Sequence, residues 1–176
     1  MTTEKATIKC EAVFSDDSQH RYALSKIWDK ALPQANVITI APSEDYNVAS
    51  DLTTNIISNN IHLLGMGGFT LTNLISKIGV DVKKVKDTKN LWNDETDKYI
   101  TDIAEKADKI ILAWGKFCST HNSFGKREEE ILKLLKPFKD KVYQICDESG
   151  REFLHPLTPA VRNGFTLKEA STIFEK

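Results

Sequence analysis

Four short segments contain the polar side chains best suited to chemistry, and each one ends or follows a stretch typical of a buried strand. They are residues 41–45 (APSED), 72–73 (TN), 114–116 (WGK) and 154–157 (LHPL). In open α/β sheets, ligands bind beyond the carboxyl ends of the strands, where loops gather helix N-termini and side chains from several crossovers. We therefore expect one pocket at this edge, built by Ser43, Asp45, Asn73, Lys116 and His155.

Asn73 and His155 carry the groups with the most specific chemistry. A carboxamide late in an apolar strand must find partners for its donor and its acceptor, and a carboxamide also reads a pyrimidine edge by paired hydrogen bonds. For Asn73 the structural and functional interpretations stay level. His155 precedes a proline, so a stiff, extended loop holds its imidazole. This geometry suits a neutral imidazole that donates to a developing oxyanion, and equally an ordinary structural hydrogen bond.

The other polar residues of these segments also have simpler interpretations. Residues 42–43 can just begin a loop, with Glu44 and Asp45 in water, and taken singly these residues favour that interpretation. Lys116, near the start of an expected helix, either holds an anion or extends into solvent. Trp114 and Gly115 end a strand, and the glycine can serve only as the turn into the next helix.

No motif for a metal or a cofactor occurs in the sequence. The 3 cysteines lack CxxC spacing, which argues against a disulfide framework and a zinc-thiolate site. Cys118 and His121 have helical spacing, yet a buried thiol is favoured over a nucleophile. Neither GxxxxGK[ST] nor GxGxxG is present, and the histidines lack metal-ligand spacing. We expect no metal and no cofactor.

The four segments must be positioned by alternating strands and helices. The apolar patterns predict strands over residues 36–40, 69–75, 109–114 and 141–146, helices over about 52–64, 92–107 and 125–136, and a short terminal helix from 166. The expected fold is α/β: a three-layer, mainly parallel four-stranded sheet with helices on both faces and an added N-terminal β-hairpin at about residues 7–28. We expect a single domain over residues 1–176.

Composition limits the partners. The chain of 176 residues has 24 Lys and Arg against 25 Asp and Glu, a net charge of -1, so no overall electrostatic attraction draws it to nucleic acid or anionic lipid. Any contact with DNA must come from a local patch. No stretch approaches 18 consecutive apolar residues, and the first residues do not have the pattern of a secretory signal. We expect a cytoplasmic protein that does not enter a membrane.

Several segments, taken in order, resemble a bacterial and phage family, the domain-of-unknown-function family numbered sixteen forty-three. The segments that carry the resemblance are Phe14 with 21–22, 41–43, 51–53, 68–74, 113–115 and 155–156. The resemblance covers nearly the whole chain and implies a family, but no activity.

A weaker likeness concerns uracil-DNA glycosylases. Residues 71–74 (LTNL), 112–116 (LAWGK) and 154–160 (LHPLTPA) with 164–165 are similar to the corresponding segments of those enzymes, in the same order. By that resemblance Asn73 would read the base edge, His155 would stabilise the departing base anion, and the 41–45 loop would hold the attacking water. Such an enzyme takes the base out of the stack. The water-positioning residue of that pattern is replaced here by Ala41, which cannot orient water, so Glu44, Asp45 or Asp51 takes its place or the pocket binds without hydrolysis.

The favoured function is therefore hydrolysis of an N-glycosidic bond in a nucleobase-bearing ligand, a nucleotide or a nucleic acid. The candidate catalytic residues are His155, Asp45 and Glu44, and the candidate substrate-binding residues are Pro42, Ser43, Asp51, Asn73, Trp114 and Lys116. Two alternatives stay open: a noncatalytic nucleotide- or nucleic-acid-binding protein of the same fold, and a protein-interaction domain of a phage or mobile element.

Overall fold

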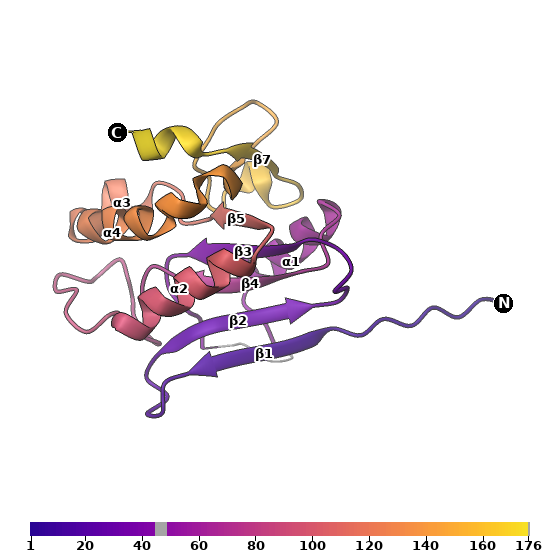
Figure 1. Cartoon of the computed structure of the whole chain (residues 1–176), viewed down its shortest axis with the longest axis horizontal. Helices are drawn as coiled ribbons and strands as arrows, with labels where there is room; N and C mark the ends of the chain where they lie inside the picture. The colour runs from indigo at the N-terminus through magenta and orange to yellow at the C-terminus, as the bar shows by residue number, and fades with distance from the viewer. Residues whose placement is uncertain (45–48, 176) are drawn as a thin grey trace.

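The computed structural model describes residues 1–44 and 49–175, which form a seven-stranded sheet with helices on both faces (Figure 1). The strands are β1 (Lys9–Phe14), β2 (Arg21–Ile27), β3 (Gln34–Thr39), β4 (Gly68–Asn73), β5 (Lys109–Leu112), β6 (Val142–Cys146) and β7 (Thr166–Glu169). The α-helices are α1 (Leu52–Leu63), α2 (Asp94–Lys106), α3 (Phe117–Thr120) and α4 (Gly125–Leu135). Short 3-10 helices are η1 (Asn122–Phe124), η2 (Lys136–Lys141), η3 (Pro159–Val161) and η4 (Ser171–Glu175). Within these described residues, no helix has the length and apolarity that crossing a bilayer requires.

The strands lie in the order β1-β2-β4-β3-β5-β6-β7. The four strands β4, β3, β5 and β6 are mutually parallel, whereas β1, β2 and β7 pair antiparallel to their neighbours. The chain moves from β3 to β4 on one side and then crosses to β5 on the other side of β3. This reversal makes a topological switch point at the carboxyl ends of β3 and β5, the place where open α/β sheets bind ligands.

The prediction of an α/β fold is confirmed, but the predicted number of strands was wrong. Residues 166–169, which were expected to begin a terminal helix, form β7 and pair with β6 from Tyr143 to Cys146. The sequence TLKE contains good helix formers, so its local propensity indicated a helix. The open edge of β6 supplies backbone hydrogen bonds that override this preference. The expected N-terminal hairpin is joined to the sheet, because β2 also pairs with β4.

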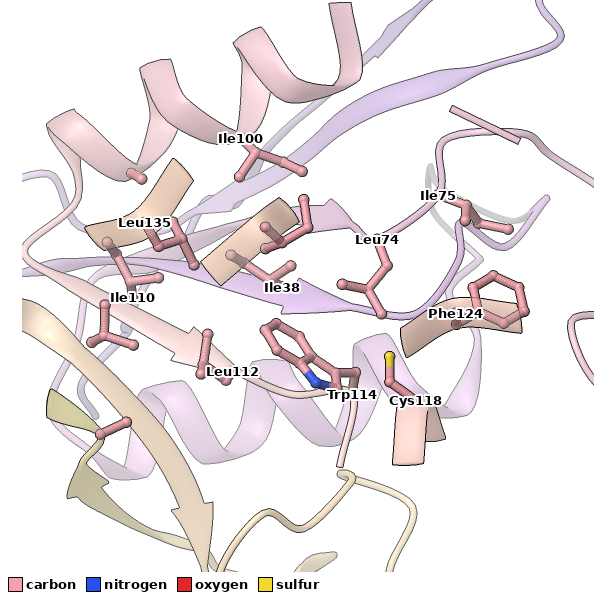
Figure 2. Close-up of a cluster of buried hydrophobic side chains, with 14 of the residues drawn as sticks. Ile38, Leu74, Ile75, Ile100, Ile110, Leu112, Trp114, Cys118, Phe124 and Leu135 are labelled. Carbon is pink, nitrogen blue, oxygen red and sulfur yellow. The ribbon is translucent and has the colours of Figure 1, made fainter. Parts of the chain in front are cut away.

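Successive side chains of the central strands point to opposite faces and create two apolar clusters. Ile38 and Leu112 belong to the cluster under α2 and α4, together with Ile100 of α2 (Figure 2). Val37 and Ile111, one residue before them, belong to the cluster under α1. Each of these side chains is buried, which stabilises the fold by about 1.5–3 kcal/mol per residue. Packing against helices therefore holds both faces of the parallel strands in place, and it also holds the edge of the sheet where these strands end.

Helix α1 begins directly at that edge. The Asp51 side chain accepts a hydrogen bond from the backbone N–H of Thr54 at 2.6 Å and caps the helix. Ile57 and Ile61 then lie on the face that packs against the sheet. The cap thus places a carboxylate beside the carboxyl ends of the parallel strands.

Candidate functional site

A cavity of about 490 Å³ opens at the carboxyl edge of the sheet, at the switch point between β3 and β5. This volume is typical of small-molecule sites, which range from about 300 to 1,000 Å³. The polar and charged lining residues include Arg21 of β2, Thr39 and Ser43 at and after the end of β3, Asp51 and Thr54 of α1, Lys83, Lys116 after β5, and His155 after β6. Three crossovers, the segment between β6 and β7, and the hairpin therefore contribute to one site.

Most of the residues expected at the site line this cavity, and two do not. Those in the lining are Pro42, Ser43, Asp51, Trp114, Lys116 and His155. Asn73 and Glu44 are outside it, and Asp45 lies outside the described residues. Glu44 is exposed to solvent.

Asn73 is held behind the cavity wall. It pairs in register with Thr39 of the neighbouring strand, and its Nδ2 donates to the Thr39 Oγ1 at 2.5 Å. Thr39 itself lines the cavity. The Asn73 Oδ1 is buried and has no partner among the described residues. In this arrangement the amide supports the wall of the cavity and does not contact its interior.

His155 is held in one tautomer. Its Nδ1 accepts the backbone N–H of Leu157 at 3.1 Å, and since an amide can only donate, Nδ1 of the neutral ring carries no proton. The proton of the neutral imidazole is therefore on Nε2. Burial lowers the pKa of His155, and the negative charge of Asp51 opposes this shift to a smaller extent. At neutral pH the ring is an uncharged hydrogen-bond donor through Nε2.

Asp51 is the acidic residue of the cavity lining within the part of the chain that the structure describes. One of its carboxylate oxygens caps α1 through the Thr54 amide. Its charge acts on two other lining groups, because it raises the pKa of both Arg21 and His155 against the effect of burial. A carboxylate, an imidazole and a guanidinium are thus electrostatically coupled around one cavity.

Arg21 is a lining residue to which the sequence analysis gave no role. Its side chain is only 2% exposed, and its Nη1 donates to the backbone oxygen of Ser43 at 3.0 Å. The Nε is buried without a partner among the described residues. A buried donor left unpaired costs about 1–3 kcal/mol. The sequence held one signal for Arg21: a single arginine stands at the start of the otherwise apolar stretch 21–24.

Trp114 and Lys116 both line the cavity, but the first side chain is buried and the second is exposed and charged. The Trp114 side chain is 1% exposed, packs in the cluster of Figure 2, and donates its Nε1 proton to the Glu128 carboxylate at 2.7 Å. Lys116 is exposed and precedes the four-residue helix α3. Trp114 therefore gives the cavity a rigid apolar side, and Lys116 supplies a positive charge at its mouth.

The thiol of Cys118, which follows Lys116 closely in the sequence, has no sign of reactivity. Cys118 is buried, and desolvation raises the pKa of its thiol to about 12, so it stays protonated at neutral pH. Over residues 1–44 and 49–175, no group of three His, Cys, Asp or Glu side chains is arranged to hold a metal ion. The charged and titratable groups available in the cavity are thus those of Arg21, Asp51, Lys83, Lys116 and His155.

These features define an α/β protein with a ligand cavity at the carboxyl edge of its parallel strands. The chain belongs to the family described as "Protein of unknown function (DUF1643)", whose model matches residues 21–157. The predicted family is thereby confirmed. The match begins at Arg21 and extends to Leu157, and every residue that lines the cavity lies within it. Neither a curated protein nor a solved structure matches the chain.

Proposed function

We propose that the protein binds a nucleobase-bearing ligand in this cavity and hydrolyses its N-glycosidic bond. The observation that carries the proposal is that Asp51 and His155 line the same cavity and interact electrostatically. The first can accept a proton and the second can donate a hydrogen bond, which are the two tasks that such a hydrolysis requires.

Asp51 is assigned the activation of water. Its carboxylate accepts a proton from the water as the oxygen attacks the anomeric carbon, and the bond from that carbon to the base nitrogen breaks. The nitrogen keeps the bonding electrons, and the departing base anion accepts a hydrogen bond from the Nε2–H of His155. A positioned general base typically contributes about 10²–10⁴-fold to such a rate.

The replacement of the water-positioning residue by Ala41 favours Asp51 over the other acids. Ala41 lines the cavity but presents only a methyl group. Glu44 is exposed and does not line the cavity. Asp51 is in the lining, is fixed by its hydrogen bond to Thr54, and keeps a second carboxylate oxygen for water.

The test is release of free base, measured by chromatography, from uridine, from uridine monophosphate and from single-stranded DNA that contains uracil. The wild type is expected to release base from at least one of them. His155→Asn, whose amide oxygen can still accept the Leu157 N–H, is expected to fold normally and release no base. Lys84→Met, outside the cavity, is the control with wild-type release. Absence of release from all three substrates by folded wild type would overturn the proposal.

A second candidate is a noncatalytic nucleotide-binding protein, which Asn73 specifically favours. Asn73 does not line the cavity and supports Thr39 from behind, so its amide is not placed to read a base edge there. This candidate predicts that nucleotides raise the melting temperature without turnover. It further predicts that binding survives in Asp51→Asn.

A further inference from the structure

The guanidinium of Arg21 differs from the other fully buried arginine of the described residues. Arg127 is 0% exposed and is compensated on every side, by the Leu74 carbonyl and by the carboxylates of Asp97 and Glu130. Arg21 is almost as buried, at 2% exposed, but donates its one side-chain hydrogen bond to the neutral carbonyl of Ser43. Its Nε has no partner among the described residues, and none of the ion pairs between those residues involves Arg21.

A guanidinium keeps its charge at neutral pH inside a protein, even though burial lowers the pKa of Arg21. A charge removed from water is stable only when an opposite charge or several hydrogen bonds compensate it. Asp51 acts on Arg21 through space, but among the described residues its carboxylate accepts from the backbone N–H of Thr54 and not from the guanidinium. Within residues 1–44 and 49–175, Arg21 thus lacks the carboxylate partners that compensate Arg127.

The described lining residues around Arg21 carry a net positive charge. The lining cations in the described residues are Arg21, Lys83 and Lys116, against the single acid Asp51, so the formal charges sum to 3 − 1 = +2 with His155 neutral. Lys83 comes from the segment between β4 and α2, and Lys116 from the segment after β5. The three cations therefore converge from separate parts of the chain.

We infer that this cavity contains a phosphate subsite, with Arg21 at its base and Lys83 and Lys116 at its rim. The inference rests on the proposed function, because it names the substrate of the same cavity as a phosphate-bearing nucleotide and not a free base or nucleoside. The planar guanidinium presents paired N–H groups that match phosphate oxygens, and the ammonium groups add point charges. The three cations carry more positive charge than the carboxylate of Asp51 can neutralise, and a bound phosphate would neutralise the excess.

The first test is titration with inorganic phosphate at constant ionic strength, followed by isothermal calorimetry. Wild type is expected to bind it at one saturable site. Arg21→Lys keeps the charge and loses the fork, so we expect binding weaker by about tenfold or more. Lys83→Met is expected to weaken binding severalfold. If phosphate does not bind saturably, or binds Arg21→Lys as well as wild type, the inference is overturned.

Two matched controls protect this test from a folding artefact. Lys84→Met removes the neighbouring lysine, which pairs with Asp81 and does not line the cavity, so phosphate affinity should stay at the wild-type value. Arg127→Met removes a buried arginine outside the cavity, so stability should fall while phosphate affinity is kept. Equal losses of affinity in Lys83→Met and Lys84→Met would show general charge attraction and overturn the inference.

Binding experiments with nucleotides show which kind of phosphate the cavity binds. They also distinguish failure of the phosphate subsite from failure of the proposed hydrolase. Uridine monophosphate should bind tighter than uridine to wild type, and Arg21→Lys should abolish this advantage. A single-stranded trinucleotide without a terminal phosphate distinguishes a strand phosphodiester from a terminal phosphate. Phosphate binding through Arg21 with no base release would support the subsite and exclude the hydrolase. Equal affinity for uridine and its monophosphate in wild type would overturn the subsite even if base were released.

Discussion

Gly115 lies so close to His155 that no side chain fits between them. A Cβ on Gly115 would lie 2.9 Å from the backbone nitrogen of His155 and 3.1 Å from its Cβ. Gly115 also has φ +60°, a left-handed conformation that glycine adopts without strain. The turn after β5 and the segment after β6 can therefore approach each other only because residue 115 is glycine. This contact sets the position of His155 in the cavity.

Gly115→Ala should lower both stability and ligand binding. The left-handed conformation alone costs about 1–2 kcal/mol with a side chain, and the contact with His155 adds to that cost. Gly150→Ala is the matched control, because Gly150 has φ +81° but nothing within 4 Å of its added Cβ. Urea unfolding should show a larger loss for Gly115→Ala, and calorimetry should show weaker binding for that variant alone. Equal losses in the two variants would contradict the packing argument.

The two roles of Asp51 can be separated by two substitutions. Asparagine is as good an N-cap as aspartate, so Asp51→Asn keeps the cap of α1 and should lower stability only through the lost attraction to Arg21. It removes the carboxylate that is assigned the activation of water, so base release should fall about 100-fold or more. Asp51→Ala loses the cap as well, so its free energy of unfolding should be about 1 kcal/mol lower than that of Asp51→Asn. A wild-type rate in Asp51→Asn would exclude the proposed role.

His155 should make stability depend on pH in one direction. Burial keeps its native pKa below the ordinary value of 6.5. As pH falls below that value, the unfolded chain gains a proton before the native protein does, so stability is lost between 6.5 and the native pKa. Above 6.5 this contribution is fully present. Urea unfolding near pH 7.5 and pH 5.5 should show a smaller loss in His155→Asn than in wild type. Burial also lowers the pKa of His20, so His20→Asn measures how much of the pH dependence comes from that second histidine.

The parallel part of the sheet could be predicted because its strands are short apolar runs that end at polar segments. The apolar side chains of β3 and β5 fill both clusters, and their order along the chain already implied the crossovers. β7 could not be predicted in this way. Its sequence favours a helix locally, and only the unpaired edge of β6, formed by a segment about twenty residues earlier, makes it a strand.

The sequence could predict those site residues that lie directly at the ends of strands or at the start of a helix. His155, Asp51 and Lys116 follow or begin elements at the carboxyl edge, and they line one cavity. Arg21 was missed because its place depends on the pairing of β2 with β4, which no local pattern reveals. Asn73 was expected inside the cavity, but the register of β3 and β4 sets it against Thr39. Register and sheet order are long-range properties.

Trp114→Phe should destabilise the protein more than Trp28→Phe. Trp114 is 1% exposed and donates its Nε1 proton to the carboxylate of Glu128 at 2.7 Å, whereas the half-buried Trp28 donates to the neutral carbonyl of Met66 at 3.0 Å. A hydrogen bond to a charged group contributes about 1.5–3 kcal/mol, and one to a neutral group about 0.5–1.5 kcal/mol. Loss of the larger ring also leaves a void in the closely packed cluster, while solvent and small shifts can fill the space at Trp28. Urea unfolding of both variants at neutral pH measures the difference, and a loss at Trp28 equal to that at Trp114 would mean that Glu128 does not anchor the cavity wall.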